Sequence, residues 1–393
     1  MLSTSLVNSV ELDDELTTMA AALRSTLAEF DEDYWAKCDR ERRYPAEYVA
    51  SMAEAGWLGM TIPQEFGGAG QSHVATAVAL HEIAASGAGL NGCIPIHMAL
   101  FATAPILRNG SSELKKAVLP KICSGETVLC FAVTEQNAGN DMSKIMTRAR
   151  QVSGEWLLSG QKIWVTQASK ASAAILLART RSAGAVRTGG LSLFFVPLEG
   201  KAVRSVPMRK IVYNAIESCE LHFDDLAVPN EYLIGQEGQG FEHILSALNS
   251  ERVLAAAEGV GIGRAALHRA VDYANERESF GHPIGAYQAI SHPLARASAL
   301  LSGAWLATLN GANKIDRGMD AGAAANEAMY LASDACYVAA DAAMQTFGGM
   351  AFSSDLSIER YYREARSFRV APVSQEMTLN YLARNVLGLT RSY

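Results

Sequence analysis

The chain has 393 residues, of which 49% are hydrophobic and 19% are charged, and its formal net charge at pH 7 is -7. This length allows more than one folding unit with a large core, and the acidic balance argues against a nucleic-acid partner, which would require a basic surface. No export signal is visible at the N-terminus, and the apolar segment 297–309 is shorter than the ~20 residues of a membrane span. We therefore expect a cytoplasmic protein with no membrane partner.

The six cysteines are scattered, without a C-x-x-C pair or a Cys/His cluster at metal-binding spacing. This usage is typical of reduced thiols that fill a core, and no metal site is predicted. The eight histidines are equally dispersed and are interpreted as structural. The cysteines are Cys38, Cys93, Cys123, Cys130, Cys219 and Cys336.

The first domain, residues 1–127, has helical periodicity. Apolar residues between Leu12 and Leu23 recur every three or four positions. Pro45 suits the start of a helix, because its missing N–H is not needed there. Helices are predicted over 45–58, 73–85 and 114–122, with a glycine-rich loop at 62–70.

The second domain, residues 128–232, changes to short alternating or β-branched segments separated by Gly, Ser and Pro. This pattern predicts a central antiparallel β-domain, because a parallel doubly wound sheet would need long helices between its strands. Strands are predicted over 128–133, 155–158, 174–178, 191–196 and 218–223.

The third domain, residues 233–393, returns to an Ala-rich helical pattern with long helices predicted over 246–274 and 294–312. The sequence therefore predicts an α+β fold that is mostly α, whose closing helices form a bundle between subunits. Gly259, Gly261 and Gly263 lie inside a helical pattern with no strand before them, so they do not form a dinucleotide fingerprint. We expect them to allow close helix packing.

The stretch from Phe131 to Thr166 is the most informative one for function. A polar loop separates two strand-like segments, and Thr134 and Thr166 offer hydroxyl groups. Gly139 would let a ligand approach the backbone, and Trp164 offers a flat apolar face. These residues could hold a large planar cofactor with polar edges, although an ordinary surface loop would have the same composition.

The sequence contains no common nucleophile, phosphate-loop or zinc-helix motif. Two acidic clusters are the remaining candidates for catalytic groups. Glu251 follows Asn249 at the predicted start of a long helix, where a carboxylate is favoured. The alternative for Glu251 is a solvated charge paired with Arg252. The segment 358–366, which contains Glu364, has spacings that predict an intrahelical ion-pair network.

In this order and at these separations, eight segments resemble the acyl-CoA dehydrogenase family. The resemblance implies a helical N-terminal domain, a central β-domain and a C-terminal four-helix bundle in a flavoenzyme that binds FAD and is usually a homotetramer. The segments are 56–70, 131–141, 162–166, 228–241, 248–252, 273–288, 345–352 and 358–366.

The resemblance also implies which residues contact the cofactor. Phe131, Val133 and Thr134 would contact the isoalloxazine edge, Trp164 would lie against the ring, and Thr166 would bond near N5. The forked guanidinium of Arg277 suits a diphosphate, which would be gripped across a subunit interface. The residues completing the cofactor pocket would be Gln288, Phe280, Gln345, Gly348, Gly349, Ser374, Gln375 and Glu376.

The substrate implied by the resemblance is an acyl thioester of CoA or of a carrier protein, and an electron-transfer flavoprotein would take the electrons. Asn140, Asn249 and Arg252 would contact this substrate. The reaction removes an α-proton and a β-hydride, so it needs a carboxylate base and donors to the thioester oxygen.

Three departures from the common pattern concern the base and its surroundings. Many members carry the base in a Tyr-Glu-Gly-Thr segment, where this chain has Ala371-Pro372-Val373-Ser374. The isovaleryl-CoA and long-chain type instead places its base at the position of Glu251, so Glu251 is predicted to be the general base and Glu364 is a weaker candidate. Pro372 also lacks the N–H that would help to hold the thioester oxygen, and the loop Lys210–Asn214 lacks the usual Gly and Arg.

These departures keep two other functions open. One is a flavin-dependent oxidase or monooxygenase on the same scaffold with a non-CoA substrate. The other is a flavin-binding partner protein without catalysis.

Overall fold

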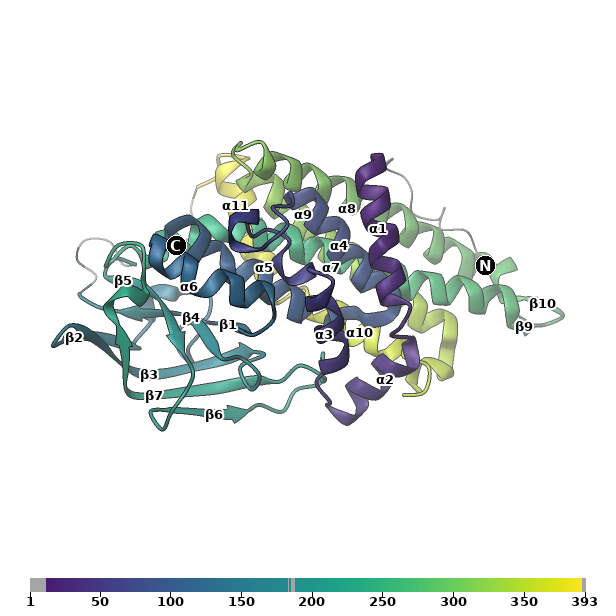
Figure 1. Cartoon of the computed structure of the whole chain (residues 1–393). Coiled ribbons are helices and arrows are strands. Elements are labelled where there is room, and N and C mark those ends of the chain that lie inside the picture. The colour runs from purple at the N-terminus through teal and green to yellow at the C-terminus, as the bar shows by residue number, and fades with distance from the viewer. Residues whose placement is uncertain (1–11, 183, 185–187, 391–393) are drawn as a thin grey trace.

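The structure is a computed structural model that describes residues 12–182, 184 and 188–390. Its N-terminal part is helical, as predicted (Figure 1). The sequence provides clear start signals, since the side chains of Asp13, Asp31, Ser72 and Ser111 each accept a hydrogen bond from the first turn of a helix. The helices are α1 (Asp14–Leu27), α2 (Glu32–Glu41), α3 (Ala46–Glu54), α4 (His73–Ile83), α5 (Gly89–Asn109) and α6 (Ser112–Cys123).

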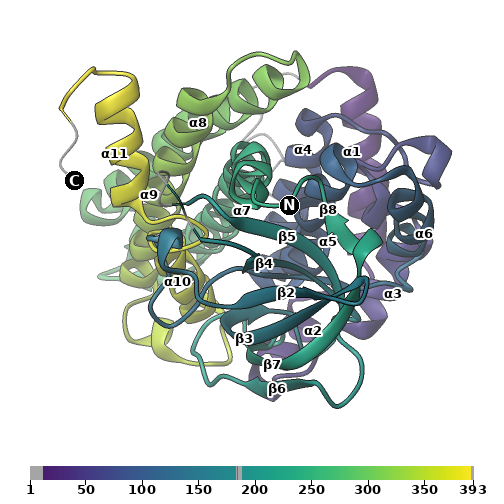
Figure 2. The same ribbon diagram turned by 90° about the vertical axis from the view of Figure 1, so that its left-hand side faces the viewer.

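The middle part is a sheet with the strand order β6-β7-β3-β2-β4-β5-β8, in which β1 also pairs with β4 (Figure 2). Most neighbours are antiparallel, as predicted, but the sheet is mixed because β1 and β2 both run parallel to β4. The strands are β1 (Leu129–Ala132), β2 (Arg148–Val152), β3 (Glu155–Thr166), β4 (Ala173–Arg179), β5 (Leu191–Pro197), β6 (Val203–Pro207), β7 (Ser218–Pro229) and β8 (Leu233–Ile234).

The C-terminal part is again helical, with a short hairpin that projects beyond the rest of the fold at the end opposite the sheet (Figure 1). The elements are α7 (Gly240–Glu276), β9 (Glu278–Ser279), β10 (His282–Pro283), α8 (Gln288–Asp316), α9 (Gly322–Phe347), a 3-10 turn (Gly348–Phe352), α10 (Ile358–Ser367) and α11 (Gln375–Asn385). Because α7 begins at Gly240, Glu251 lies three turns inside this helix. The expectation that Glu251 occupies a first helical turn is therefore wrong.

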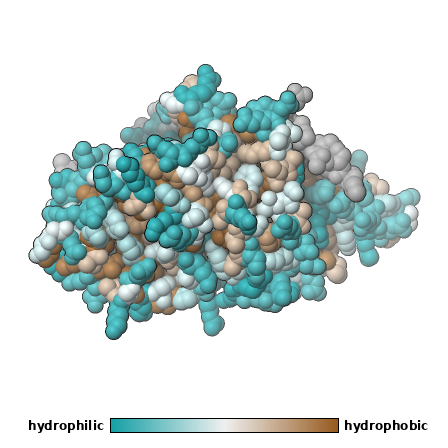
Figure 3. All heavy atoms as spheres, viewed as in Figure 1, coloured by the Kyte–Doolittle hydropathy of each residue, from teal (hydrophilic) through white to brown (hydrophobic). Residues whose placement is uncertain are grey.

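The core is divided by the alternation of side chains along the strands. On β4, Ile175 and Leu177 face the large core shared with the helices, whereas Ala174 and Leu176 face a smaller core on the other side of the sheet. The larger core also joins the N-terminal helices to α7, α8 and α9. On the outside, the face shown in Figure 3 has a hydrophilic rim and weakly hydrophobic residues near its middle.

The glycines in the middle of α7 allow close helix packing, as predicted. A Cβ atom at Gly261 would lie 2.5 Å from Cβ of Ala84, and one at Gly263 would lie 2.6 Å from a methyl carbon of Leu301. These contacts bring α7 against the end of α4 and against α8, so α7 forms the axis of the helical part.

One apolar stretch escaped the sequence prediction. Residues His73–Asn109 are long and apolar enough to cross a membrane by length and composition, but 78% of the most apolar window is buried inside the fold. In this structure α4 and α5 are therefore core helices.

Candidate active site

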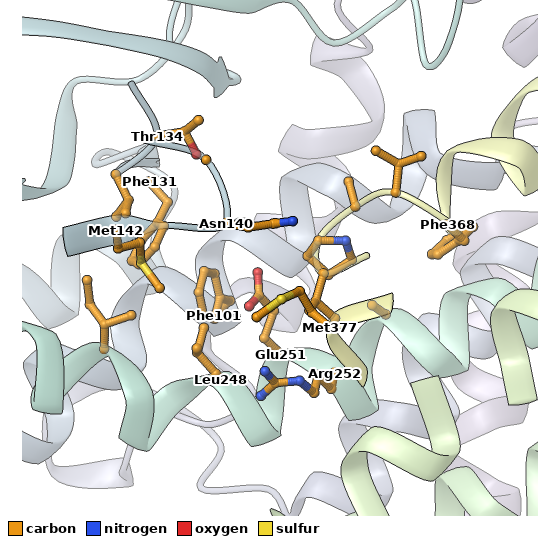
Figure 4. A pocket seen from close by; sticks show the side chains of 18 of the residues that line it. Phe101, Phe131, Thr134, Asn140, Met142, Leu248, Glu251, Arg252, Phe368 and Met377 are labelled. Carbon is orange, nitrogen blue, oxygen red and sulfur yellow. The ribbon is translucent and has the colours of Figure 1, made fainter. Parts of the chain in front are cut away.

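A cavity of about 940 Å³ lies between α5, α7, the loop after β1 and the C-terminal segment 367–390 (Figure 4). Each helix contributes one face, because the lining residues recur every three or four positions. From α5 these are Leu90, Ile94, His97, Met98 and Phe101, and from α7 they are Phe241, Ile244, Leu245, Leu248, Glu251, Arg252, Ala255 and Glu258.

The sheet side of the cavity contains the residues predicted to contact a planar cofactor. Phe131, Val133, Thr134, Asn140, Trp164 and Thr166 all line it. Trp164 is presented by an irregularity in the β3–β7 pairing between Lys162 and Val165. It has a φ of 56° and remains 50% exposed, so its indole face is free for a ligand. A Cβ atom at Gly139 would meet nothing within 4 Å.

A buried ion pair connects strand β3, which carries Trp164, to the loop after β1, which carries Thr134. Nζ of Lys162, on β3, donates to Oε1 of Glu135 (2.8 Å) and to the carbonyl of Val133 (2.9 Å). Glu135 also accepts from the backbone N–H groups of Met146 and Thr147. Burial lowers the pKa of Lys162 to about 8. The pair fixes Thr134 relative to Trp164, although neither charged residue lines the cavity.

Glu251 points into the cavity from α7, opposite Asn140 (Figure 4). Burial raises the pKa of its carboxyl, while His97 and Arg252 partly oppose this shift. Among the described residues, nothing forms a hydrogen bond or an ion pair with this carboxylate. The alternative of a solvated charge paired with Arg252 is not what the structure shows, since Arg252 contacts Asn249 (Nη1 to Oδ1, 3.4 Å). A raised pKa and a carboxylate that is free to meet a ligand in a cavity are properties of a general base.

A second pair of titratable groups lines the same cavity. Nδ1 of His97 lies 2.8 Å from Oε1 of Glu258, and both side chains are buried. The negative charge of Glu258 raises the pKa of His97 against the effect of burial, and the carboxylate of Glu251 adds to this shift. The two carboxylates therefore stabilise the charged imidazole relative to the neutral one.

The loop at 210–214, whose sequence differs from the family pattern, brings Tyr213 to the cavity wall. Lys210 donates through Nζ to the carbonyls of Val212 and Tyr213, both at 2.6 Å. The Tyr213 hydroxyl lies within hydrogen-bonding reach of Thr166 and Ser218. In place of the expected Gly and Arg, the loop therefore adds a phenol next to Thr166.

The C-terminal segment lines one side of the cavity and places Pro372 on its wall. Three neighbouring residues predicted to contact the cofactor do not line it. Ser374 instead caps α11 by accepting from the N–H of Met377, and the Gln375 side chain donates to Ser333 (2.9 Å). Glu376 is exposed.

The residues predicted to hold the diphosphate and adenosine lie outside the cavity, at the end opposite the sheet. Arg277 leads into the β9–β10 hairpin, and Phe280 at its tip is 93% exposed. Tyr273 stacks on Phe347 with ring centroids 4.1 Å apart, which joins the base of the hairpin to the end of α9. The other predicted residues at this end are Gln288, Gln345, Gly348 and Gly349, and all of them are exposed.

Helix α10 forms the predicted ion pairs between Glu359 and Arg363 (2.5 Å) and between Arg360 and Glu364 (3.9 Å). It also reaches other elements, since Arg363 pairs with Asp39 of α2 (2.9 Å). Glu364 is buried and accepts from the N–H of Leu90 (2.9 Å), but it does not line the cavity. Its position supports a structural role. Within the described ranges, no cluster of three or more His, Cys, Asp or Glu could hold a metal ion.

Sequence reasoning overlooked His97, Glu258, Lys162, Glu135 and Tyr213. His97 had the weakest signal, because a lone histidine on an apolar helix face is usually a core residue. Lys162 lies within a segment that was singled out, but a buried lysine cannot be distinguished from an exposed one without knowing its partner.

The cavity fits a flavin ring. It joins the flat face of Trp164 to hydroxyl groups of Thr134 and Thr166 and to the amide of Asn140, which can bond a planar group along its polar edge. The single chain does not enclose the rest of a dinucleotide, because Arg277 and Gln345 lie elsewhere.

Comparison with known proteins gave three consecutive family matches. The acyl-CoA dehydrogenase N-terminal, middle and C-terminal domains match residues 13–126, 130–226 and 238–387. The acyl-CoA dehydrogenase FadE12 of Mycobacterium tuberculosis is 34% identical over 397 residues, covering 100% of both chains. The human mitochondrial short-chain specific acyl-CoA dehydrogenase is 32% identical, with 91% of this chain and 86% of that protein covered.

Solved structures agree with this result. A glutaryl-coenzyme A dehydrogenase in complex with glutaryl-CoA superposes with a TM-score of 0.93 and 30% identity, covering 98% of each chain. Butyryl-CoA dehydrogenase from Megasphaera elsdenii superposes with a TM-score of 0.92 and 25% identity, covering 96% of this chain and 100% of that one.

Proposed function

Because the chain belongs to the acyl-CoA dehydrogenase family, we propose that it catalyses the α,β-dehydrogenation of an acyl thioester with Glu251 as the general base. Enzymes of this family are FAD-dependent oxidoreductases, and FAD is the cofactor of this chain. When bound, FAD accepts the β-hydrogen with its electron pair. The acyl group would lie in the cavity between α5 and α7.

The position of Glu251 is the observation that carries this proposal. Its carboxylate points into the cavity opposite Asn140 (Figure 4), and Trp164 and Thr166 line the same cavity. A substrate between Glu251 and the cofactor ring would have its α-carbon near the carboxylate and its β-carbon near the ring. Burial raises the pKa of Glu251, which strengthens it as a base towards a weakly acidic α-proton.

Anaerobic mixing of the purified holoenzyme with a panel of acyl-CoAs tests the proposal. We expect at least one thioester to bleach the flavin absorbance. Glu251→Gln should slow bleaching by roughly 10²–10⁴-fold, the usual contribution of a general base, while binding the same amount of FAD. Glu242→Gln is the matched control, because Glu242 lies on the same helix but is exposed. Equal bleaching by wild type and Glu251→Gln would contradict the assignment of the base.

The second candidate function is a flavin-dependent oxidase or monooxygenase, and Pro372 favours it. This residue lies on the cavity wall without an N–H to donate to a thioester oxygen. Flavin that stays oxidised with every thioester, but is reduced by NAD(P)H with a reductase, would support this function. The absence of reduction under both conditions would support a flavin-binding partner protein.

The assembly and cellular context are also part of the proposal. The exposed hairpin at Phe280 and the exposed glycines at 348–349 would complete the cofactor site of a neighbouring subunit in a homotetramer. An electron-transfer flavoprotein would reoxidise the flavin. The thioester carrier would be CoA or a carrier protein, and the enzyme would act in the cytoplasm.

A further inference from the structure

We propose that His97 and Glu258 select an acyl chain that carries a neutral oxygen function, a hydroxyl or a keto group, beyond its reacting carbons. This inference rests on the proposed function, because it assumes that an acyl chain occupies the cavity between α5 and α7. It adds a substrate class, which the comparisons leave open.

The pair is a polar feature in an otherwise apolar part of the cavity. Around His97, the lining of α5 consists of Ile94, Met98 and Phe101, and the next lining residue before Glu258 on α7 is Ala255. Taking an ionic pair out of water is costly, and apolar residues of similar size would often serve the fold as well. A cavity meant only for an alkyl chain gains nothing from this pair.

His97 and Glu258 each have a polar atom that is not used in their mutual hydrogen bond and can bind a ligand. Nδ1 of His97 is taken by Glu258 at 2.8 Å, and among the described residues nothing is bonded to Nε2. The adjacent Glu258 carboxylate stabilises the protonated imidazole, which carries an N–H on both nitrogens. His97 can thus donate from Nε2, and Glu258 has a second carboxylate oxygen that can accept. A hydroxyl group would use both, and a keto group would use the donor.

A carboxylate is poorly suited to the pair itself. The positive charge of His97 is already balanced by Glu258 at 2.8 Å, so a further carboxylate bound to His97 would lie close to that of Glu258 and be repelled. The two arginines that line the cavity do not belong to the pair, since Arg252 is six residues before Glu258 on α7 and Arg384 lies on α11. The pair therefore suits a neutral oxygen function.

The position of the pair fits the distal part of the chain. Glu258 follows Glu251 by seven residues on the same face of α7, a distance of about 10 Å along the helix axis. If Glu251 takes the α-proton, the oxygen recognised by His97 and Glu258 lies several bonds further along the acyl chain.

Binding of matched acyl-CoAs tests the inference. The probes are pairs of equal length, one a straight alkyl chain and the other carrying a terminal hydroxyl or keto group. Affinity is measured by calorimetry with the FAD-loaded Glu251→Gln variant, in which turnover is suppressed. We expect the oxygenated member of the best-fitting pair to bind roughly tenfold more tightly, the effect of one additional net hydrogen bond.

The double substitution His97→Leu/Glu258→Leu removes both partners, so it leaves no unpaired buried charge. It should invert the preference towards the alkyl chain without changing the FAD content. Glu258→Gln is the milder second variant and should reduce the preference. Equal binding of matched chains by the parent protein, or an unchanged preference in both variants, would overturn the inference. Flavin that no thioester reduces in the wild type would instead contradict the proposed function.

Discussion

At the scale of single residues, the site depends on carboxylates whose surroundings differ. Glu364 is fully buried and Glu251 is half-buried on the cavity wall, and burial raises the pKa of each, that of Glu364 to about 7. Only Glu251 lines the cavity, whereas Glu364 is held by the N–H of Leu90. Access to the cavity, and not the pKa alone, distinguishes the candidate base from the structural acid.

The raised pKa of Glu251 predicts how the rate of flavin reduction depends on pH. A base acts in its ionised form, so the rate should fall as the pH decreases through the pKa of Glu251, which lies above the ordinary glutamate value of 4.5. Stopped-flow reduction by saturating acyl-CoA over a pH series measures this. Glu242→Gln should keep the same profile. A rate that is constant, or that rises towards low pH, would contradict the role of Glu251.

Lys162 should be important for stability because it is fully buried and paired with Glu135. Lys162→Met leaves the Glu135 carboxylate without its counter-ion, and breaking a buried pair typically costs about 3–5 kcal/mol. Urea unfolding of the holoenzyme measures the loss, and weaker FAD binding should accompany it, because the pair fixes Thr134 against β3.

Lys144→Met is the control for this substitution, because its pair with Asp141 is exposed and should contribute less than about 1 kcal/mol. If Lys162→Met proves no more destabilising than Lys144→Met, the buried pair does not have the proposed structural role.

At the scale of elements, the packing of α7 determines where its cavity face points. Gly261→Ala places a methyl group 2.5 Å from both Cβ of Ala84 and the carbonyl oxygen of His81. Such overpacking should destabilise the protein by about 1–3 kcal/mol and shift the Glu251 face, lowering the reduction rate. Gly303→Ala in α8 meets nothing within 4 Å and should be stabilising by about 0.5–1 kcal/mol through helix propensity. Thermal unfolding compares the two, and equal melting temperatures would contradict the close-packing argument.

The sequence predicted those elements whose pattern is local. The capped helices α4 and α6 were found, and so were the short apolar strands β4 and β5. Helix α5 was not delimited, because Pro95 and Pro105 lie inside it and proline normally indicates a helix boundary. Tertiary packing overrides that local preference, since α5 is buried between the sheet and α7.

The same limit applies to the candidate site, because the residues within locally recognisable segments were predicted and the contacts between distant residues were not. Glu251 and the Trp164 wall were identified by their similarity to family segments, whereas His97 and Glu258 are 161 residues apart and become a pair only when α5 packs on α7. The long helix was predicted to begin at residue 246, whereas α7 begins six residues earlier, at Gly240.

At the scale of the whole molecule, two exposed aromatic residues at the end that carries the β9–β10 hairpin indicate a partner surface. Phe280 is 93% exposed and Phe352 is 79% exposed, and both lie in segments that the family resemblance assigns to a neighbouring cofactor site. Exposed aromatic residues at the tip of an ordered hairpin are typical of an interface. A second copy of this chain would cover them and bring Arg277 to the diphosphate.

Phe280→Asp should therefore affect assembly and cofactor binding together. The charge would have to be buried without a partner in the interface, so light scattering after gel filtration should show a shift from tetramer to smaller species. FAD should dissociate from these species, while FMN, which lacks the adenosine half, should bind wild type and variant alike. Val152→Asp, at the sheet end of the molecule (Figure 1), should leave assembly and FAD content unchanged. A Phe280→Asp variant that remains tetrameric and retains FAD would show that the hairpin does not complete a neighbouring subunit's site.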